Sequence, residues 1–202
     1  MKTFKPLLFT IMFCAYISTV SASPVNLALT GDANQSSTLT AIPSGGGDSI
    51  TAYADLAIDG ITDGNFWHGS VSHTKFDSDA WWEVDLGDTY TIDHINIWNR
   101  TDGGWGYRLH HFTVSILNDV GMSVWQNYYE DDPGYLLELN GLFINGQFVK
   151  IEFDSGYTVD RYLQLAEVQV WGDPNPVPLP GAVWLFVSSI IGIVSVSRKL
   201  KK

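Results

Sequence analysis

Short runs of alternating apolar and polar residues recur through the middle of this chain and constrain its fold more than any other feature. In the run 81–86, Trp82, Val84 and Leu86 alternate with acidic residues. The same period of two recurs in the runs 95–98, 114–116, 137–139, 149–153 and 163–170, the last with a slip near Ala166. Clusters of Gly, Asp and Asn separate these runs. Strands of this length and spacing predict an all-β, antiparallel β-sandwich.

The first 22 residues predict an export signal rather than part of the fold. Lys2 and Lys5 precede an apolar stretch from Leu7 to Val20, and the small residues up to Ala22 suit cleavage by signal peptidase. We therefore expect the protein to be exported, with a mature chain that starts at residue 23.

The C-terminal 22 residues predict a membrane segment. Residues 181–197 carry no charge, and the chain then closes on four cations, Arg198, Lys199, Lys201 and Lys202. A helix of these 17 residues spans about 25 Å, slightly less than a bilayer core. We predict a transmembrane helix within residues 181–202, with its basic end in the cytoplasm. A proline-rich linker at 173–180 precedes it.

Residues 23–172 remain as one domain of ordinary size, without cysteine and therefore without a disulfide. All 22 acidic residues but only five of the 11 basic ones lie between residues 23 and 173, which gives this stretch a formal charge of −17. Such a charge excludes nucleic acid as a partner. It also favours a bound hard cation, and Ca²⁺ is the abundant one outside the cytoplasm.

Two of the five basic residues, Arg100 and Arg108, lie close together in a glycine-rich stretch. Arginine offers a fixed fork of donors that suits paired sugar hydroxyls, and a neutral histidine such as His73 adds one more polar contact. Among the aromatic residues, Phe66, Trp67 and Trp105 are candidates for an apolar surface that packs against a sugar ring. Residue chemistry alone equally allows an Arg100–Asp102 ion pair and aromatics that belong to the core.

The spacing of these residues resembles the signature of F-type lectins (fucolectins), a family of the discoidin, or coagulation-factor C-type, superfamily. His73 is followed by 26 residues, then by Arg100-Thr101-Asp102, five residues and Arg108. The resemblance covers nearly all of residues 25–172 and implies a jelly-roll, galactose-binding-like β-sandwich. It is carried by the stretches 26–29, 57–60, 68–70, 81–87, 99–102 and 167–172.

The resemblance implies that His73, Arg100 and Arg108 hydrogen-bond the ring oxygen and the 3- and 4-hydroxyls of L-fucose. It also implies that Phe66, with Trp67 beside it, packs near the sugar methyl group and that Asp102 braces the arginines. The chain departs from the family pattern twice. Five residues rather than four separate Asp102 from Arg108, and Gly103-Gly104 replaces a vicinal cysteine pair, so that Trp105 is the candidate shelf for the sugar.

The resemblance further implies one structural Ca²⁺ ion. The matching side-chain ligands are Asp59, Ser70 and Glu167, and the matching main-chain carbonyls are those of Leu56, Ile61 and Ala166. Oxygen ligands of this kind suit Ca²⁺ better than Zn²⁺.

The C-terminal segment resembles the PEP-CTERM class of sorting signals, in the variant that begins Val177-Pro178-Leu179-Pro180. This implies a Gram-negative bacterium whose exosortase acts near the motif. The protein is then expected to be anchored in the inner membrane on the periplasmic side and afterwards processed to the cell surface or released.

Together these features predict a lectin that binds terminal L-fucose or a similarly configured sugar, on fucosylated glycans or in exopolysaccharide. The alternative is a discoidin-type structural or adhesion module without sugar binding, which the altered turn after Asp102 motivates. A glycosidase needs two carboxylates that face one pocket, and no spacing among the acids singles out such a pair. We therefore expect no enzymatic activity.

Overall fold

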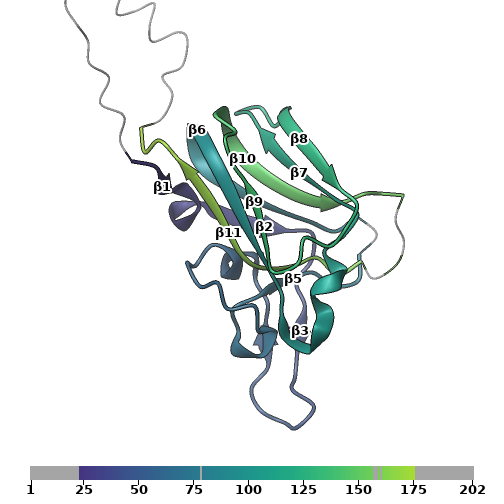
Figure 1. Ribbon diagram of the computed structural model, residues 1–202. Helices are drawn as coiled ribbons and strands as arrows, with labels where there is room; N and C mark the ends of the chain where they lie inside the picture. The colour runs from purple at the N-terminus through teal and green to yellow at the C-terminus, as the bar shows by residue number, and fades with distance from the viewer. Residues whose placement is uncertain (1–22, 78, 157–158, 160, 176–202) are drawn as a thin grey trace, which may run out of the picture.

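The computed structural model describes residues 23–77, 79–156, 159 and 161–175 (Figure 1). The predicted signal peptide at 1–22 and the predicted transmembrane helix within 181–202 lie outside these residues, as does most of the linker at 173–180. Within the described ranges, no helix is long and apolar enough to span a membrane.

The regular elements in the described part of the chain are strands and four short 3-10 helices, which turns and irregular segments connect. The helices are η1 (Leu27–Thr30), η2 (Ala54–Ala57), η3 (Phe66–His68) and η4 (Asp102–Arg108). The strands are β1 (Val25–Asn26), β2 (Asp32–Gln35), β3 (Thr40–Ala41), β4 (Ile50–Thr51), β5 (Ser72–His73), β6 (Trp81–Asn99), β7 (Phe112–Leu117), β8 (Ser123–Tyr129), β9 (Leu136–Leu139), β10 (Ile144–Phe153) and β11 (Gln164–Gly172).

Strand β6 joins the two layers of the sandwich. Its first part, residues 81–85, pairs with β2 and β10, and β10 continues through β7 to β8. Its last part, residues 95–99, pairs with β11 and β9. Gly87, at φ +86°, lies between two stretches of β6, residues 81–85 and 90–92, that both pair with β10, at the register shift between Gly146 and Phe148. All these pairings are antiparallel, so the predicted antiparallel β-sandwich is confirmed.

The core lies between the layers and is built from the alternating positions. Trp82, Val84, Ile95 and Ile97 are at most 1% exposed, whereas their sequence neighbours on β6 reach further into solvent. The indole Nε1 of Trp82 donates to the carbonyl of Ala54 at 2.9 Å, which ties η2 to the sandwich. Because a strand shows alternate side chains to opposite faces, the pattern seen in the sequence becomes one buried face.

The predicted alternating runs fall in the strands β6, β7, β9, β10 and β11, except that Leu163, the first residue of the last run, precedes β11. The slip expected near Ala166 is a register shift between Leu165 and Glu167. The sequence did not predict β8, because this edge strand leaves most of its residues exposed and therefore lacks an alternating pattern.

Strand β11 connects the two ends of the domain. It starts at Gln164, opposite His73 on β5, and ends at Gly172, opposite Val25 on β1. At roughly 3.3 Å per residue, the eight steps from Gln164 to Gly172 separate these ends by about 26 Å. The turns around β5 and η4 therefore lie at one end of the sandwich and both ends of the described domain at the other (Figure 1).

Candidate sugar-binding site

Four segments meet at the loop end of the sandwich. Helix η3 follows the turn at Asn65, β5 pairs with the start of β11, and η4 follows directly after the end of β6. His73 lies on β5, Arg100 just beyond β6, and Arg108 at the end of η4. His73 lies 27 residues before Arg100 and 35 before Arg108, and the fold brings the three predicted residues into one region, where the charges of both arginines act on His73.

His73 is 2% exposed and is held by its own backbone neighbourhood. Its Nδ1 lies 2.6 Å from the carbonyl oxygen of Thr74. Because a carbonyl oxygen only accepts, Nδ1 carries the proton, and in the neutral ring Nε2 is then an acceptor. Burial lowers the pKa of His73 to about 4, and the charges of Arg100 and Arg108 add to this effect. The imidazole is therefore neutral at pH 7.

Arg100 is 6% exposed and is fixed by three hydrogen bonds. Its Nε and Nη2 donate to the two carboxylate oxygens of Asp102 at 2.7 and 2.8 Å, and its Nη1 donates to Gln164 Oε1 at 3.1 Å. Burial opposes ionisation of Asp102, but the bonds from Arg100 and from the Phe66 N–H outweigh it, so that the pKa of Asp102 is lowered. Asp102 was predicted to brace both arginines, and in the part of the chain that the structure describes it bonds Arg100.

Arg108 is half-buried and is held by aromatic faces. Its guanidinium lies 4.1 Å from the ring centroid of Trp105 and 4.7 Å from that of Tyr162. Its Nε is buried and has no hydrogen-bond partner in the part of the chain that the structure describes. Contact with two rings restrains the guanidinium, and the N–H at Nε is left unpaired.

The three predicted aromatic residues differ in exposure. Phe66 is 2% exposed, packs edge to face against His73 and lies under the guanidinium of Arg100 at 4.8 Å. It therefore supports the polar residues from beneath. Trp67 and Trp105 are 45% and 40% exposed and can offer apolar surface to a ligand directly.

The altered turn after Asp102 positions Trp105. Gly103 and Gly104 have φ of +61° and +73°, a region that glycine adopts without strain. A Cβ on Gly103 would lie 2.7 Å from the indole of Trp105. The indole can therefore fold back over Gly103 only because that residue is glycine.

Two of the predicted cation ligands, Asp59 and Glu167, lie close to each other, because Gly60 next to Asp59 bonds Glu167 on β11. Glu167 is fully buried, and the N–H of Gly60 donates to its two carboxylate oxygens at 3.2 and 3.3 Å. Burial raises the pKa of Glu167 to about 8, and the charge of Asp59 raises it further. Partial burial and the charge of Asp55 raise the pKa of Asp59 as well. Among the described residues, Glu167 forms no ion pair with a basic side chain.

Two further observations bear on a cation. The hydroxyl of Ser70 donates to the carbonyl oxygen of Asp63 at 2.6 Å. Within the described ranges, no group of three or more His, Cys, Asp or Glu side chains is placed to hold a metal ion. The predicted ligand set contains only two such side chains, Asp59 and Glu167, and takes its other oxygens from Ser70 and from backbone carbonyls.

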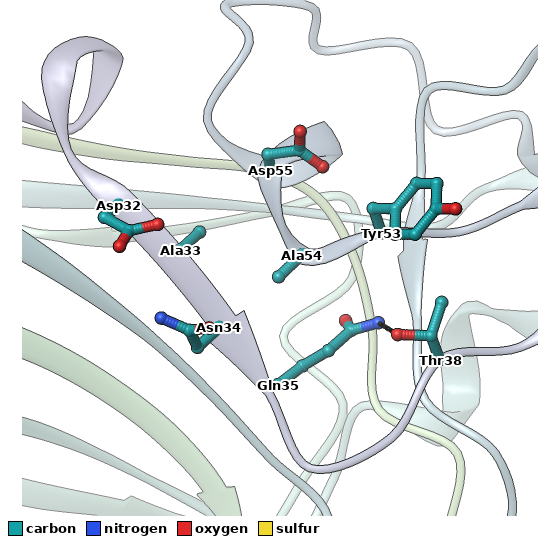
Figure 2. Close-up of a pocket in the computed structure, with 8 residues that line it drawn as sticks. All are labelled: Asp32, Ala33, Asn34, Gln35, Thr38, Tyr53, Ala54 and Asp55. Carbon is teal, nitrogen blue, oxygen red and sulfur yellow. Dashed lines mark hydrogen bonds between the residues drawn. The ribbon is translucent and has the colours of Figure 1, made fainter.

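A separate hollow of about 440 Å³ lies along β2 and η2 (Figure 2). Its lining holds carboxylates and amides but no arginine or histidine, and it contains none of the residues predicted for sugar binding. The lining residues are Asp32, Ala33, Asn34, Gln35, Thr38, Tyr53, Ala54 and Asp55.

Two residues of the site were not predicted from the sequence. Gln164 bonds Arg100, and Tyr162 stacks on Arg108. Gln164 is the first residue of β11 and Tyr162 lies two residues before it, more than 50 residues after the arginines, where no spacing rule connects them. Gln164 is one of three polar residues on β11, with Glu167 and Gln169, so its side-chain type did not single it out.

Known proteins resemble this chain over the same region. The sequence profile of the family described as NedA-like, galactose-binding domain, matches residues 56–137, which include His73, Arg100 and Arg108. Fucolectin-1 of Anguilla japonica is 41% identical over 93 residues, 43% of this chain and 49% of that protein. The chain spans only 38–52% of the length of the fucolectins that it matches.

Two solved structures match over nearly their whole length. The lectin domain of Lectinolysin, in complex with the Lewis B antigen, is 35% identical with a TM-score of 0.62, over 74% of this chain and 97% of that chain. A fucose binding module of Streptococcus pneumoniae is 32% identical with a TM-score of 0.62, over 72% of this chain and 96% of that chain.

Proposed function

Because this chain belongs to the F-type lectin (fucolectin) family, as its 35% identity over nearly the whole lectin domain of Lectinolysin shows, we propose that it binds terminal L-fucose or a similarly configured sugar. The binding residues are His73, Arg100 and Arg108, with Trp67 and Trp105 at the rim and Phe66 beneath. Asp102 and Gln164 position Arg100 and do not themselves contact the sugar.

The clustering of two arginines around one neutral histidine carries this proposal. Arginine only donates, so the arginines satisfy hydroxyl oxygens and leave the hydroxyl hydrogens in need of acceptors. His73 supplies one, because its Nδ1 proton is held by Thr74 O, which leaves Nε2 of the neutral ring as an acceptor. A ring oxygen carries no proton to donate. We therefore assign a sugar hydroxyl to His73 and the ring oxygen to an arginine.

We propose binding without turnover. The similar proteins are lectins and a fucose binding module, and the site gathers donors rather than a pair of facing carboxylates. Assays with aryl fucosides are expected to show no hydrolysis. Sustained release of the aryl group would contradict this part of the proposal.

A single open site is expected to bind weakly, with a free energy of about −4 to −6 kcal/mol. Firm attachment to a glycan surface then requires several copies of the protein or of the sugar. We therefore expect slow dissociation from dense fucosylated surfaces and fast exchange with the free monosaccharide.

Calcium is part of the proposal because the acids near the site fit a cation. Glu167 is fully buried beside Asp59 without a basic partner among the described residues, which is costly for a carboxylate. The residues that would hold Ca²⁺ are Asp59, Ser70 and Glu167, with the carbonyls of Leu56, Ile61 and Ala166. The ion would neutralise both carboxylates and fix the loop around residues 59–70 against β11.

We also propose that the protein is exported and tethered by its C-terminal segment, with exosortase processing as a later step. The sequences at 1–22 and 177–202 support this, and the sugar site lies at the end of the domain away from β1 and the end of β11. Deleting residues 176–202 is expected to move the protein from the membrane fraction to the soluble exported fraction. Unchanged fractionation would contradict the tether.

A glycan array tests the proposed function. Wild-type protein is expected to bind fucosylated glycans, and Arg108→Ala, whose side chain carries little of the fold, is expected to lose that binding. If the wild type binds no fucosylated glycan, the lectin proposal fails, and a structural or adhesion role without sugar binding replaces it.

A further inference from the structure

A series of ring contacts leads from the floor of the site to solvent. Phe66 packs edge to face on His73, His73 on Tyr162, and Tyr162 on Phe76, with centroid distances of 5.4, 5.7 and 5.3 Å. Exposure rises from 2% for Phe66 and His73 to 58% for Phe76. We call these four side chains the aromatic row.

Both arginines of the site stand over this row. Arg100 lies 4.8 Å from the ring centroid of Phe66, and Arg108 lies 4.7 Å from that of Tyr162. A sugar that both guanidinium groups bind is therefore adjacent to Tyr162. Phe76 is the next ring beyond it, one contact further toward solvent and outside the cluster of hydrogen-bonding residues.

Phe76 has the properties of a platform for a ligand. A single exposed phenylalanine is ordinary in proteins. Phe76 differs because its ring is braced by Tyr162 and borders a binding site. An aromatic face of this kind suits the apolar C–H face of a pyranose, and bracing reduces the side-chain entropy lost on binding.

We propose that Phe76, braced by Tyr162, is the platform for the second sugar of an oligosaccharide whose terminal sugar occupies the His73–Arg100–Arg108 cluster. This inference rests on the proposed function. The ligand class is a fucosylated oligosaccharide whose next residue is a pyranose with an exposed C–H face. The charge of −17 over residues 23–173 favours a neutral second sugar over a uronic or sialic acid.

The test compares two probes by isothermal titration: methyl α-L-fucoside, which reaches only the terminal position, and Lewis b oligosaccharide, which extends beyond it. Wild-type protein is expected to bind the oligosaccharide more tightly. Phe76→Ala is expected to reduce the ratio of the two affinities roughly three- to tenfold. Phe143→Ala is the matched control, since Phe143 is 69% exposed and lies beside the pairing of Ile144 with Ile92, far along β6 from Asn99.

The outcomes separate this inference from the function on which it rests. A fall in the ratio for Phe76→Ala but not for Phe143→Ala supports the platform. An unchanged ratio with intact fucoside binding overturns the platform and leaves the lectin function standing. If the wild type binds neither probe, the proposed function fails and the platform fails with it.

Discussion

The two arginines of the site are held in opposite ways. Arg100 is 6% exposed and donates three hydrogen bonds to Asp102 and Gln164. Arg108 is half-buried between Trp105 and Tyr162, and its Nε has no partner among the described residues. Arg100 is therefore part of the fold as well as of the site, whereas Arg108 is available mainly to the ligand. We call Arg100 with Asp102 and Gln164 the rigid half of the site, and Arg108 with Trp105 and Tyr162 the adaptable half. Both halves border the same histidine acceptor, His73.

The largest expected difference between the two arginines is in stability. Arg100→Ala leaves the carboxylate of Asp102 without its ion-pair partner, which is expected to cost about 3 kcal/mol or more of unfolding free energy. Arg108→Ala removes ring contacts worth about 1 kcal/mol. Urea unfolding of both variants measures this. Equal losses would show that the two residues are not held differently.

Calcium is expected to act on the rigid half, because β11 carries both Gln164 and Glu167. Without the ion, the pKa of Glu167 is raised to about 8 in the folded protein from 4.5, so stability is greatest at low pH and falls as pH rises through that window. Added Ca²⁺ should therefore raise the melting temperature by several degrees at pH 8 and by less at pH 5.

Glu167→Gln provides the control for the calcium experiment. This variant is expected to lose both the pH trend and the response to Ca²⁺. Identical melting curves of the wild type in EDTA and in Ca²⁺ at pH 8 would exclude the ion from this position.

The protonation state of His73 is expected to set the pH dependence of sugar binding. Protonation of His73, whose pKa is lowered to about 4, removes the lone pair on Nε2 while both arginines keep their charge. Fucoside affinity is expected to be constant from pH 7 to 5 and to fall about tenfold for each unit below pH 4. Circular dichroism at each pH confirms that the fold persists. A midpoint near 6.5 would mean that His73 is not the buried, neutral acceptor described.

The smallest effect is expected on the adaptable half. Gly103→Ala places a Cβ against the Trp105 indole and should weaken fucoside binding roughly three- to tenfold through the displaced Arg108. Gly121→Ala controls for backbone strain, since Gly121 also has a positive φ but nothing within 4 Å of the added Cβ. Equal effects of both substitutions on binding would show that Trp105 does not position Arg108 for the sugar.

The features of this fold and site that the sequence predicts are those set by residues close together in the sequence or by the family spacing. Alternation predicted the buried strands because burial on one face imposes a period of two on local sequence. The spacing of His73, Arg100, Asp102 and Arg108 predicted their assembly through family resemblance. Tyr162 and Gln164 were not predicted, because they reach the arginines only through strand pairing across more than 50 residues.

The turn after Asp102 shows a second limit. Gly103-Gly104 indicates a flexible turn in the sequence, but its two positive φ angles and the contact with Trp105 depend on the folded backbone. The exposed edge strand β8 shows a third limit of sequence-based prediction. Because neither face of this strand is mostly buried, its sequence carries no alternating pattern.

The central claim is that His73, Arg100 and Arg108 form a fucose site, and isothermal titration of methyl α-L-fucoside against wild type and Arg108→Ala tests it most directly. The account predicts one saturable site in the wild type with a free energy of about −4 to −6 kcal/mol. It also predicts that Arg108→Ala, with nearly unchanged stability, loses at least tenfold in affinity. Absence of saturable binding in the wild type, or equal binding by the variant, would contradict the claim.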